Sequence, residues 1–317
     1  MKREFIKELT VGMDTNSKYA VRHKAGLNKY KDKEGYWFGL TVGDATGDVS
    51  LRYWGKDSGQ TKSLYSSLNV GDVINVSGSV KDYQGEAQLA VDANYNTLEK
   101  TTDYETEDFV ETSARDLDAL YKYLLEVKAA IKNEHLRRLL EAFFSDPKFA
   151  EDFKRCPGSK KRHHGYIGGL LEHTVGVIEL CEACSSYYPW MDKDLLMAGA
   201  VLHDIGKMRE YVVTTSIEFT DEGRLRGHIS IGSEMLQEKI KKIGNFPEDL
   251  KMKLDHMLVS HHGELEWGSP RRPKIPEAAT LHYADYFDSQ VKAFLEIEDT
   301  GETWVFDKML DRYIYMK

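Results

Sequence analysis

One stretch decides the fold of the larger part of this chain, Leu202-His203-Asp204-Ile205-Gly206-Lys207. It places an imidazole beside a carboxylate at the end of an apolar, helix-forming run, 194–203. Charges without partners are costly to bury, so this pair needs a partner inside the protein. Imidazole and carboxylate groups bind divalent metals together, and one carboxylate can bridge two ions. The stretch therefore predicts a metal site at the end of a buried helix.

Further residues that suit a metal site lie on both sides of this stretch. His173 follows Gly168–Glu172 on an expected helix, and His228, His261 and Asp285 come later in that order. A single His is more often structural than a ligand, but an ordered series of His and Asp residues is typical of a metal centre. The series predicts that these side chains converge.

The sequence does not decide which histidine of the run 256–262 would bind the metal. His256 and His261 are five residues apart and do not share a helical face, so we expect only one of them to bind the metal. His261 is favoured because it lies at the expected helix end beside a Gly turn. His256 and His262 remain alternatives.

The ordered pattern resembles that of the HD-domain metal phosphohydrolases. The similarity includes GGLLEHT (168–174), LHDIGK (202–207), SHHGE (260–264) and LHYAD (281–285). Together with the N-terminal part described next, the chain resembles the YhaM-type 3′-5′ exoribonucleases. The resemblance implies a helical bundle that holds one or two divalent metals through His173, His203, Asp204, His228, His261 and Asp285.

Residues 1–100 have the pattern of a small β-barrel. Short runs that alternate apolar and polar residues are separated by Gly and Asp turns, near 19–24, 36–42, 49–54, 72–80 and 87–91. A helical segment at 62–68 lies between the third and fourth runs, which resembles the OB-fold. We therefore expect a two-domain α+β protein. Residues 1–100 form the OB-type barrel, 101–115 the linker, and 116–317 a mainly helical HD domain with a small C-terminal β-hairpin.

Side chains that point outward from the barrel suit a single-stranded nucleic acid. Alternation directs Phe38 inward and Trp37 and Arg52 outward, and Tyr30 lies in a basic loop. OB-folds stack bases on such aromatic rings and hold the backbone with cations. The alternative is that these residues pack on the surface and the lysines solvate a loop.

Three residues of the helical part are further candidates for substrate contact. Arg162 and His164 belong to a basic turn before His173, and the resemblance places this turn at the mouth of the site. His164 would contact a phosphate and Arg162 would add positive potential. Arg272 lies in a Pro-rich basic loop, 268–276. Solvated turns without function are the alternative for all three.

Asp204 and Lys207 are the catalytic candidates. Two metals bridged by Asp204 would lower the pKa of a bound water and clamp a phosphate. Lys207 lies one turn after His203 and would contact the scissile phosphate or protonate the leaving oxygen, unless it is simply an exposed lysine. The mixed His and carboxylate set suits manganese, cobalt, iron or nickel, and the resemblance points to manganese or cobalt.

Composition limits the remaining possibilities. No apolar run reaches membrane-span length, and the charged start 1–7 does not read as a signal peptide, so we expect a cytoplasmic protein. The formal net charge is −9, yet residues 1–100 are nearly neutral. Nucleic acid would therefore bind the N-terminal part, while metals supply positive charge to the acidic remainder.

Three functions fit these patterns. The first is a metal-dependent 3′-5′ exoribonuclease on single-stranded RNA, with single-stranded DNA as a second candidate substrate. The second is a phosphohydrolase of small nucleotides or cyclic dinucleotides with a regulatory barrel. The third is a non-enzymatic single-strand-binding factor, which the large ligand set disfavours. Cleavage polarity and a homo-oligomeric state follow from the resemblance alone.

Overall fold

The computed structural model describes residues 4–161, 163–297, 299–308 and 310–317. The chain divides into two compact units. One comprises Met1–Glu111 with the hairpin tip Val213–Ser216, and the other comprises Thr112–Val212 with Ile217–Lys317. The first is a β-barrel and the second a helical bundle that ends in a small hairpin, so the predicted two-domain α+β fold is confirmed.

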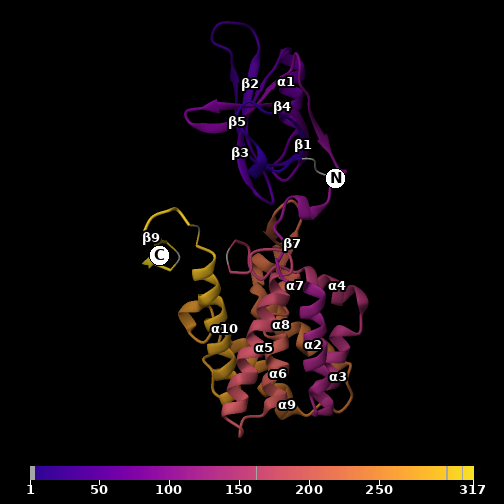
Figure 1. Cartoon of the computed structure of the whole chain (residues 1–317). Coiled ribbons are helices and arrows are strands. Elements are labelled where there is room, and N and C mark those ends of the chain that lie inside the picture. The colour runs from indigo at the N-terminus through magenta and orange to yellow at the C-terminus, as the bar shows by residue number, and fades with distance from the viewer. Residues whose placement is uncertain (1–3, 162, 298, 309) are drawn as a thin grey trace. The chain divides into compact units, whose positions relative to one another are not determined.

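The barrel closes through five strands (Figure 1). Neighbours pair in the order β1-β2-β3-β5-β4, and β4 pairs again with β1. Only the β3–β5 pairing is parallel among these contacts. A sixth strand, Leu98–Thr101 (β6), extends the sheet beside β4. The five barrel strands are Asp14–Lys29 (β1), Tyr36–Asp44 (β2), Gly47–Trp54 (β3), Val73–Tyr83 (β4) and Glu86–Asp92 (β5).

Strand alternation fills the barrel as predicted. Phe38, Leu40 and Leu51 are buried, and the ring of Phe38 stacks on Tyr53 with centroids 4.8 Å apart. Helix α1, Ser58–Ser67, lies between β3 and β4, where a helix was predicted at 62–68. It begins earlier because the Asp57 side chain accepts a hydrogen bond from the amide of Gln60 and so caps its first turn.

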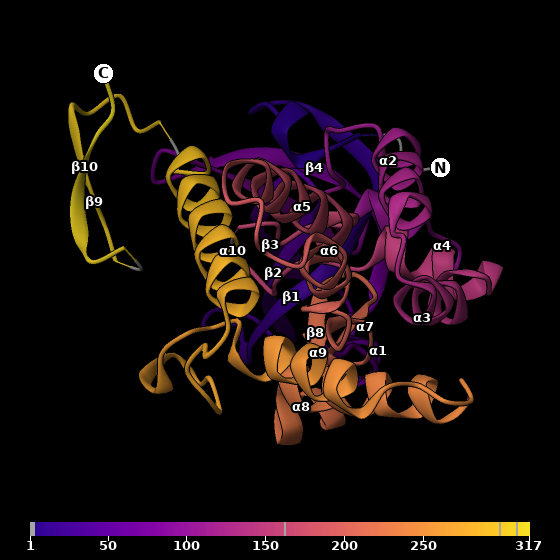
Figure 2. The same ribbon diagram turned by 90° about the horizontal axis from the view of Figure 1, so that it is seen from below.

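The helical unit packs its helices around α5 and α6, which are apolar on most sides. Figure 2 shows α10 running beside α5 and the hairpin β9–β10 beyond α10. Its main elements are Leu117–Ala130 (α2), Glu134–Phe144 (α3), Pro147–Arg155 (α4), Gly169–Tyr187 (α5), Lys193–Leu202 (α6), Lys207–Glu210 (α7), Asp221–Lys241 (α8), Glu248–Ser260 (α9), Pro276–Leu295 (α10), Trp304–Asp307 (β9) and Arg312–Tyr315 (β10).

Two local predictions differ from the structure. The sequence pattern of 211–219 and 221–225 predicts a small hairpin. Tyr211–Val213 (β7) and Ile217–Phe219 (β8) form one, but 221–225 begin helix α8. Thr220 caps that helix by accepting from the amide of Gly223. The alternating pattern that starts at Val291 predicts an extended segment, but 291–295 continue α10, because Ala293 packs inward against the C-terminal hairpin.

In the described part of the chain, no helix is both long enough and apolar enough to cross a membrane.

Candidate metal centre

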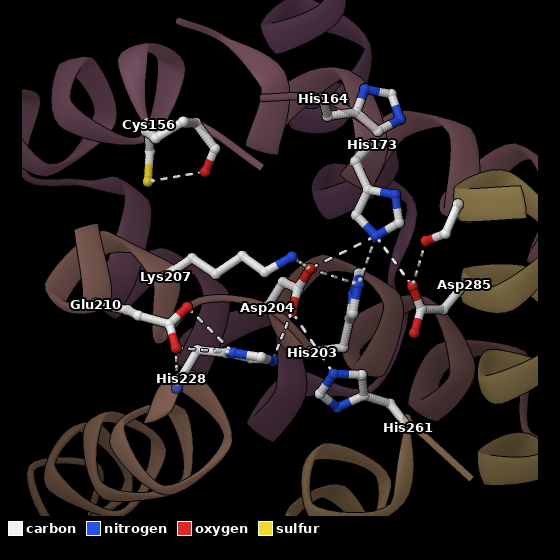
Figure 3. A network of polar contacts seen from close by, with 12 residues as sticks. Cys156, His164, His173, His203, Asp204, Lys207, Glu210, His228, His261 and Asp285 are labelled. Atoms are coloured by element: carbon white, nitrogen blue, oxygen red, sulfur yellow. Dashed lines mark hydrogen bonds and ion pairs between the residues drawn. The ribbon is translucent and has the colours of Figure 1, made fainter. Parts of the chain in front are cut away.

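Five elements bring the predicted ligands to one point in the helical unit (Figure 3). His173 comes from α5, His203 and Asp204 from the turn after α6, and Asp285 from α10. His228 and His261 complete the set from α8 and from the end of α9. His173, His203, Asp204 and His261 are at most 3% exposed. The structure therefore joins all six predicted ligands, which are spread over more than a hundred positions of the chain.

Asp204 lies at the centre, and its two oxygens face different groups. Oδ2 is 3.5 Å from Nε2 of His173 and 3.4 Å from Nε2 of His203. Oδ1 is 3.5 Å from Nε2 of His228 and 3.6 Å from Nε2 of His261. Asp285 joins the first group, with Oδ1 3.2 Å from Nε2 of His173. This arrangement suits a carboxylate that bridges two cations.

Each of the four histidines is oriented by a hydrogen bond from its Nδ1. His203 donates to the carbonyl of Ala200 at 2.8 Å and His261 to that of Leu258 at 2.7 Å. The rings of His173 and His228 donate to carboxylates, Asp288 at 2.7 Å and Glu210 at 3.2 Å. A proton on Nδ1 leaves the Nε2 lone pair facing the centre, as in most metal-binding histidines.

These residues fit a divalent metal. Nε2 of His173 and Nε2 of His203 lie 3.2 Å apart, which places two lone pairs against each other. Asp204 Oδ1, His228 Nε2 and His261 Nε2 are buried and have no hydrogen-bond partner. Buried acceptors without donors are costly, and a cation would satisfy them all. His173, His203 and Asp204 meet the spacing of a metal site, and so do His228, His261 and His262.

The centre favours positive charge. Burial opposes ionisation of Asp204, but Lys207 and His203 outweigh it and hold the pKa of that carboxyl well below its usual range. Burial likewise opposes a proton on His173, but Asp285 and Asp288 outweigh it and raise its pKa to about 10. A metal on Nε2 would provide the same charge as that proton.

Lys207 is not an exposed lysine. Its Nζ lies 2.6 Å from Oδ2 of Asp204, and Lys207 lines a cavity at the centre together with His173, Asp204 and Asp285. Burial lowers the pKa of this amine, but the neighbouring Asp204 carboxylate outweighs burial and raises it. Lys207 therefore carries its proton at the centre, where it can face a phosphate oxygen.

His262 and His256 differ in their surroundings. His262 lines the cavity and donates from Nδ1 to the carbonyl of Trp267 at 3.1 Å. Burial and the neighbours His261 and His228 lower its pKa to about 4, so its Nε2 offers a lone pair. His256 instead accepts a hydrogen bond from the amide of Lys274 at 2.9 Å, and the structure does not bring it to the metal cluster.

The three residues of this unit that were predicted to contact substrate differ in their position relative to the cavity. His164 lines the cavity, but it is buried and its Nε2 donates to Asp288 at 2.9 Å. Arg272 pairs with Glu264 at 2.7 Å and is not part of the cavity lining. Arg162 lies outside the residues that the structure describes.

Two carboxylates that sequence reasoning missed support the ligands. Asp288 Oδ2 accepts from both His173 and His164, and Glu210 accepts from the ring and the amide of His228. Asp288 lies one helical turn after Asp285 and Glu210 one turn after Lys207. That spacing was a usable signal, because residues three apart share a helical face.

The barrel candidates lie on its outer surface. The guanidinium of Arg52 lies over the ring of Trp37 at 4.5 Å, and Lys33 lies over the ring of Tyr30 at 4.3 Å. Tyr30 and Lys33 line a groove of about 500 Å³ with Trp54 and Lys81. Trp37 and Arg52 are partly exposed but are not part of that groove.

Comparison with known proteins finds relatives over most of this chain. The family model described as HD domain matches residues 170–290. A 3′-5′ exoribonuclease YhaM from Bacillus subtilis (strain 168) is 32% identical over 256 residues, which are 80% of this chain and 78% of that protein. A second 3′-5′ exoribonuclease YhaM, from Geobacillus sp. (strain WCH70), is 32% identical over 252 residues, which are 80% of this chain and 75% of that protein. The solved HD domain of the phosphodiesterase PgpH from L. monocytogenes is 20% identical, covers 38% of this chain and 67% of its own, and has a TM-score of 0.29.

Proposed function

Because this chain belongs to the family of YhaM-type 3′-5′ exoribonucleases, we propose that it shortens single-stranded RNA from the 3′ end by metal-dependent hydrolysis. The observation that carries the chemistry is Asp204, whose two oxygens face two separate groups of imidazole Nε2 atoms. Such a carboxylate would hold two cations together with the surrounding imidazoles, and two cations suit attack on a phosphodiester.

The residues divide between two ions. His173, His203, Asp204 and Asp285 would hold one, while Asp204, His228 and His261 would hold the other, with His262 beside it. The bound metals supply an activated water and neutralise charge on the phosphate. We propose manganese or cobalt as the metal, with iron and nickel as alternatives, because imidazole ligands bind these ions better than they bind magnesium.

Besides the residues that would hold the metals, the side chain of Lys207 is proposed to take part in the reaction. In the proposed hydrolysis a water oxygen bonds to phosphorus and the bond from phosphorus to the 3′ oxygen of the penultimate nucleotide breaks. The products are a nucleoside 5′-monophosphate and an RNA with a new 3′ hydroxyl. The protonated amine of Lys207, beside Asp204, is placed to contact the phosphate or to give a proton to the departing oxygen.

The barrel is proposed as the holder of the single strand. Tyr30 and Trp54 present rings in the groove and Lys33 and Lys81 add cations, a combination that stacks bases and follows a phosphate backbone. Arg52 on Trp37 offers a second cation and ring beside it. We assign 1–100 to this binding domain, 101–115 to the linker and 116–317 to the catalytic domain. Single-stranded DNA as a second substrate, a cytoplasmic location and a homo-oligomeric state are part of the same proposal.

A labelled RNA tests the proposed function. Single-stranded RNA with a 5′ label and added manganese should shorten from its 3′ end with the unaltered protein. Asp204→Asn keeps the shape of the side chain but removes its charge, and should abolish shortening. Asp32→Asn, an exposed carboxylate of the barrel, serves as the matched control. RNA that stays intact with the folded, manganese-loaded protein would contradict the proposal.

A further inference from the structure

The cavity at the metal centre extends beyond the ligands. It has a volume of about 510 Å³, and buried Asp204 and half-buried Asp285 share its lining with Trp267 and Tyr286. Sites for one small molecule measure about 300–1,000 Å³. The cavity therefore has a size that suits about one nucleotide next to the scissile bond.

Trp267 and Tyr286 form a fixed aromatic pair. Their ring centroids are 5.1 Å apart and their planes are 7° from parallel. Yet 51% of Trp267 and 41% of Tyr286 stay exposed, so the pair adds little to the core. Trp267 ends a short 3-10 turn, Leu265–Trp267, in which no residue is buried.

The pair is tied to the metal centre on both sides. Tyr286 directly follows the ligand Asp285 on α10. The carbonyl of Trp267 accepts a hydrogen bond from the ring of His262, which adjoins the ligand His261. Both rings therefore have a set position relative to the residues that would hold the scissile phosphate.

We infer that the Trp267–Tyr286 pair is the stacking platform for the base of the 3′-terminal nucleotide of the RNA, an inference that rests on the proposed function. Each ring covers one face of the other, which leaves an outer face for a base. Stacking accepts every base because each has a π face, so the platform selects a terminal nucleotide without selecting its sequence. The phosphate on the 5′ side of that nucleotide then faces Asp204 and Lys207.

Two RNAs that differ only at the last position test the platform. One ends in adenosine and the other in a ribose without a base. We expect the unaltered protein to remove the adenosine nucleotide with a kcat/KM about 5- to 150-fold higher, the range that loss of one base–aromatic stack produces. Trp267→Ala should reduce this ratio to about one. Trp190→Ala, which removes a 75% exposed tryptophan between α5 and α6, should leave the ratio unchanged.

Further measurements separate the alternatives. Trp267→Phe retains a ring and should keep most of the preference, and calorimetric manganese binding should be the same in all three variants. A preference that persists in Trp267→Ala, or equal removal of both ends by the unaltered protein, would overturn the platform and leave the exonuclease intact. If the unaltered protein shortens neither RNA, the proposed function itself fails.

Discussion

The carboxylate of Asp288 lies 2.7 Å from Nδ1 of His173, so this ring is held between Asp288 on one side and the metal centre on the other. The same oxygen, Oδ2, also accepts from His164 at 2.9 Å. Gly176 leaves room for this carboxylate, since a Cβ there would lie 2.5 Å from Oδ1 of Asp288. Asp288 thus determines which nitrogen of His173 is free to bind a metal.

Replacing Asp288 should weaken the first metal position. In Asp288→Asn the acceptor loses its charge, so His173 becomes a poorer ligand and is held less firmly. Loss of such a supporting contact reduces metal affinity by about 10- to 100-fold. Isothermal titration with manganese measures the effect, and Asp32→Asn is the control. Unchanged affinity would show that Asp288 does not position the ring.

Replacing Glu210 should weaken the second metal position instead. Glu210 accepts from the Nδ1 and from the amide of His228, whose Nε2 faces Oδ1 of Asp204. In Glu210→Gln we expect about 10- to 100-fold weaker binding of one of two ions, with the other retained. Titration that resolves the two binding events measures this. If Glu210→Gln and Asp288→Asn weaken the same event, the division of ligands between two ions is wrong.

Lys207 should contribute to turnover more than to metal binding. Lys207→Met keeps the length of the side chain but removes the amine beside Asp204. If the amine contacts the phosphate or protonates the leaving oxygen, kcat should fall by about 10²- to 10⁴-fold. Steady-state kinetics on RNA with saturating manganese separates kcat from KM. A normal kcat in the variant would remove Lys207 from the mechanism.

Gly227 should be required for the position of His228. It interrupts α8 with φ 69° and ψ 156°, a conformation that only glycine adopts easily, and the second segment of the helix starts at His228. A Cβ at Gly227 would lie 4.0 Å from Oε1 of Glu210, an ordinary contact, so Gly227→Ala costs backbone strain of about 1–3 kcal/mol. Urea denaturation measures this loss. Gly244→Ala, at a position with open space and no positive φ, is the control and should change stability little.

The barrel groove should account for part of the salt dependence of RNA binding. Lys33 and Lys81 line the groove with Tyr30 and Trp54. Replacing both lysines with methionine should reduce the slope of log affinity against log salt by about 1.4, since each contact to a single strand contributes about 0.7. Fluorescence anisotropy with a labelled RNA measures it. Lys122→Met, an exposed lysine of α2, should not change the slope.

The sequence by itself determined the elements and the chemical types of the ligands. Alternating residues such as Phe38 and Leu40 define barrel strands because side chains on a strand alternate between its two faces. His203-Asp204 after an apolar run predicted a buried metal site because such a pair is costly without a cation. Both conclusions depend on the spacing of residues that are close together in the sequence.

Only the tertiary structure decided how those ligands are shared and supported. The sequence favours His261 over His256 but leaves both open. In the structure His256 accepts from the amide of Lys274, and His261 faces Asp204. The contacts of Asp288 with His164 and His173 join positions 124 and 115 residues apart. Contacts of this separation depend on how helices pack, because no local pattern records which side chains meet across the core.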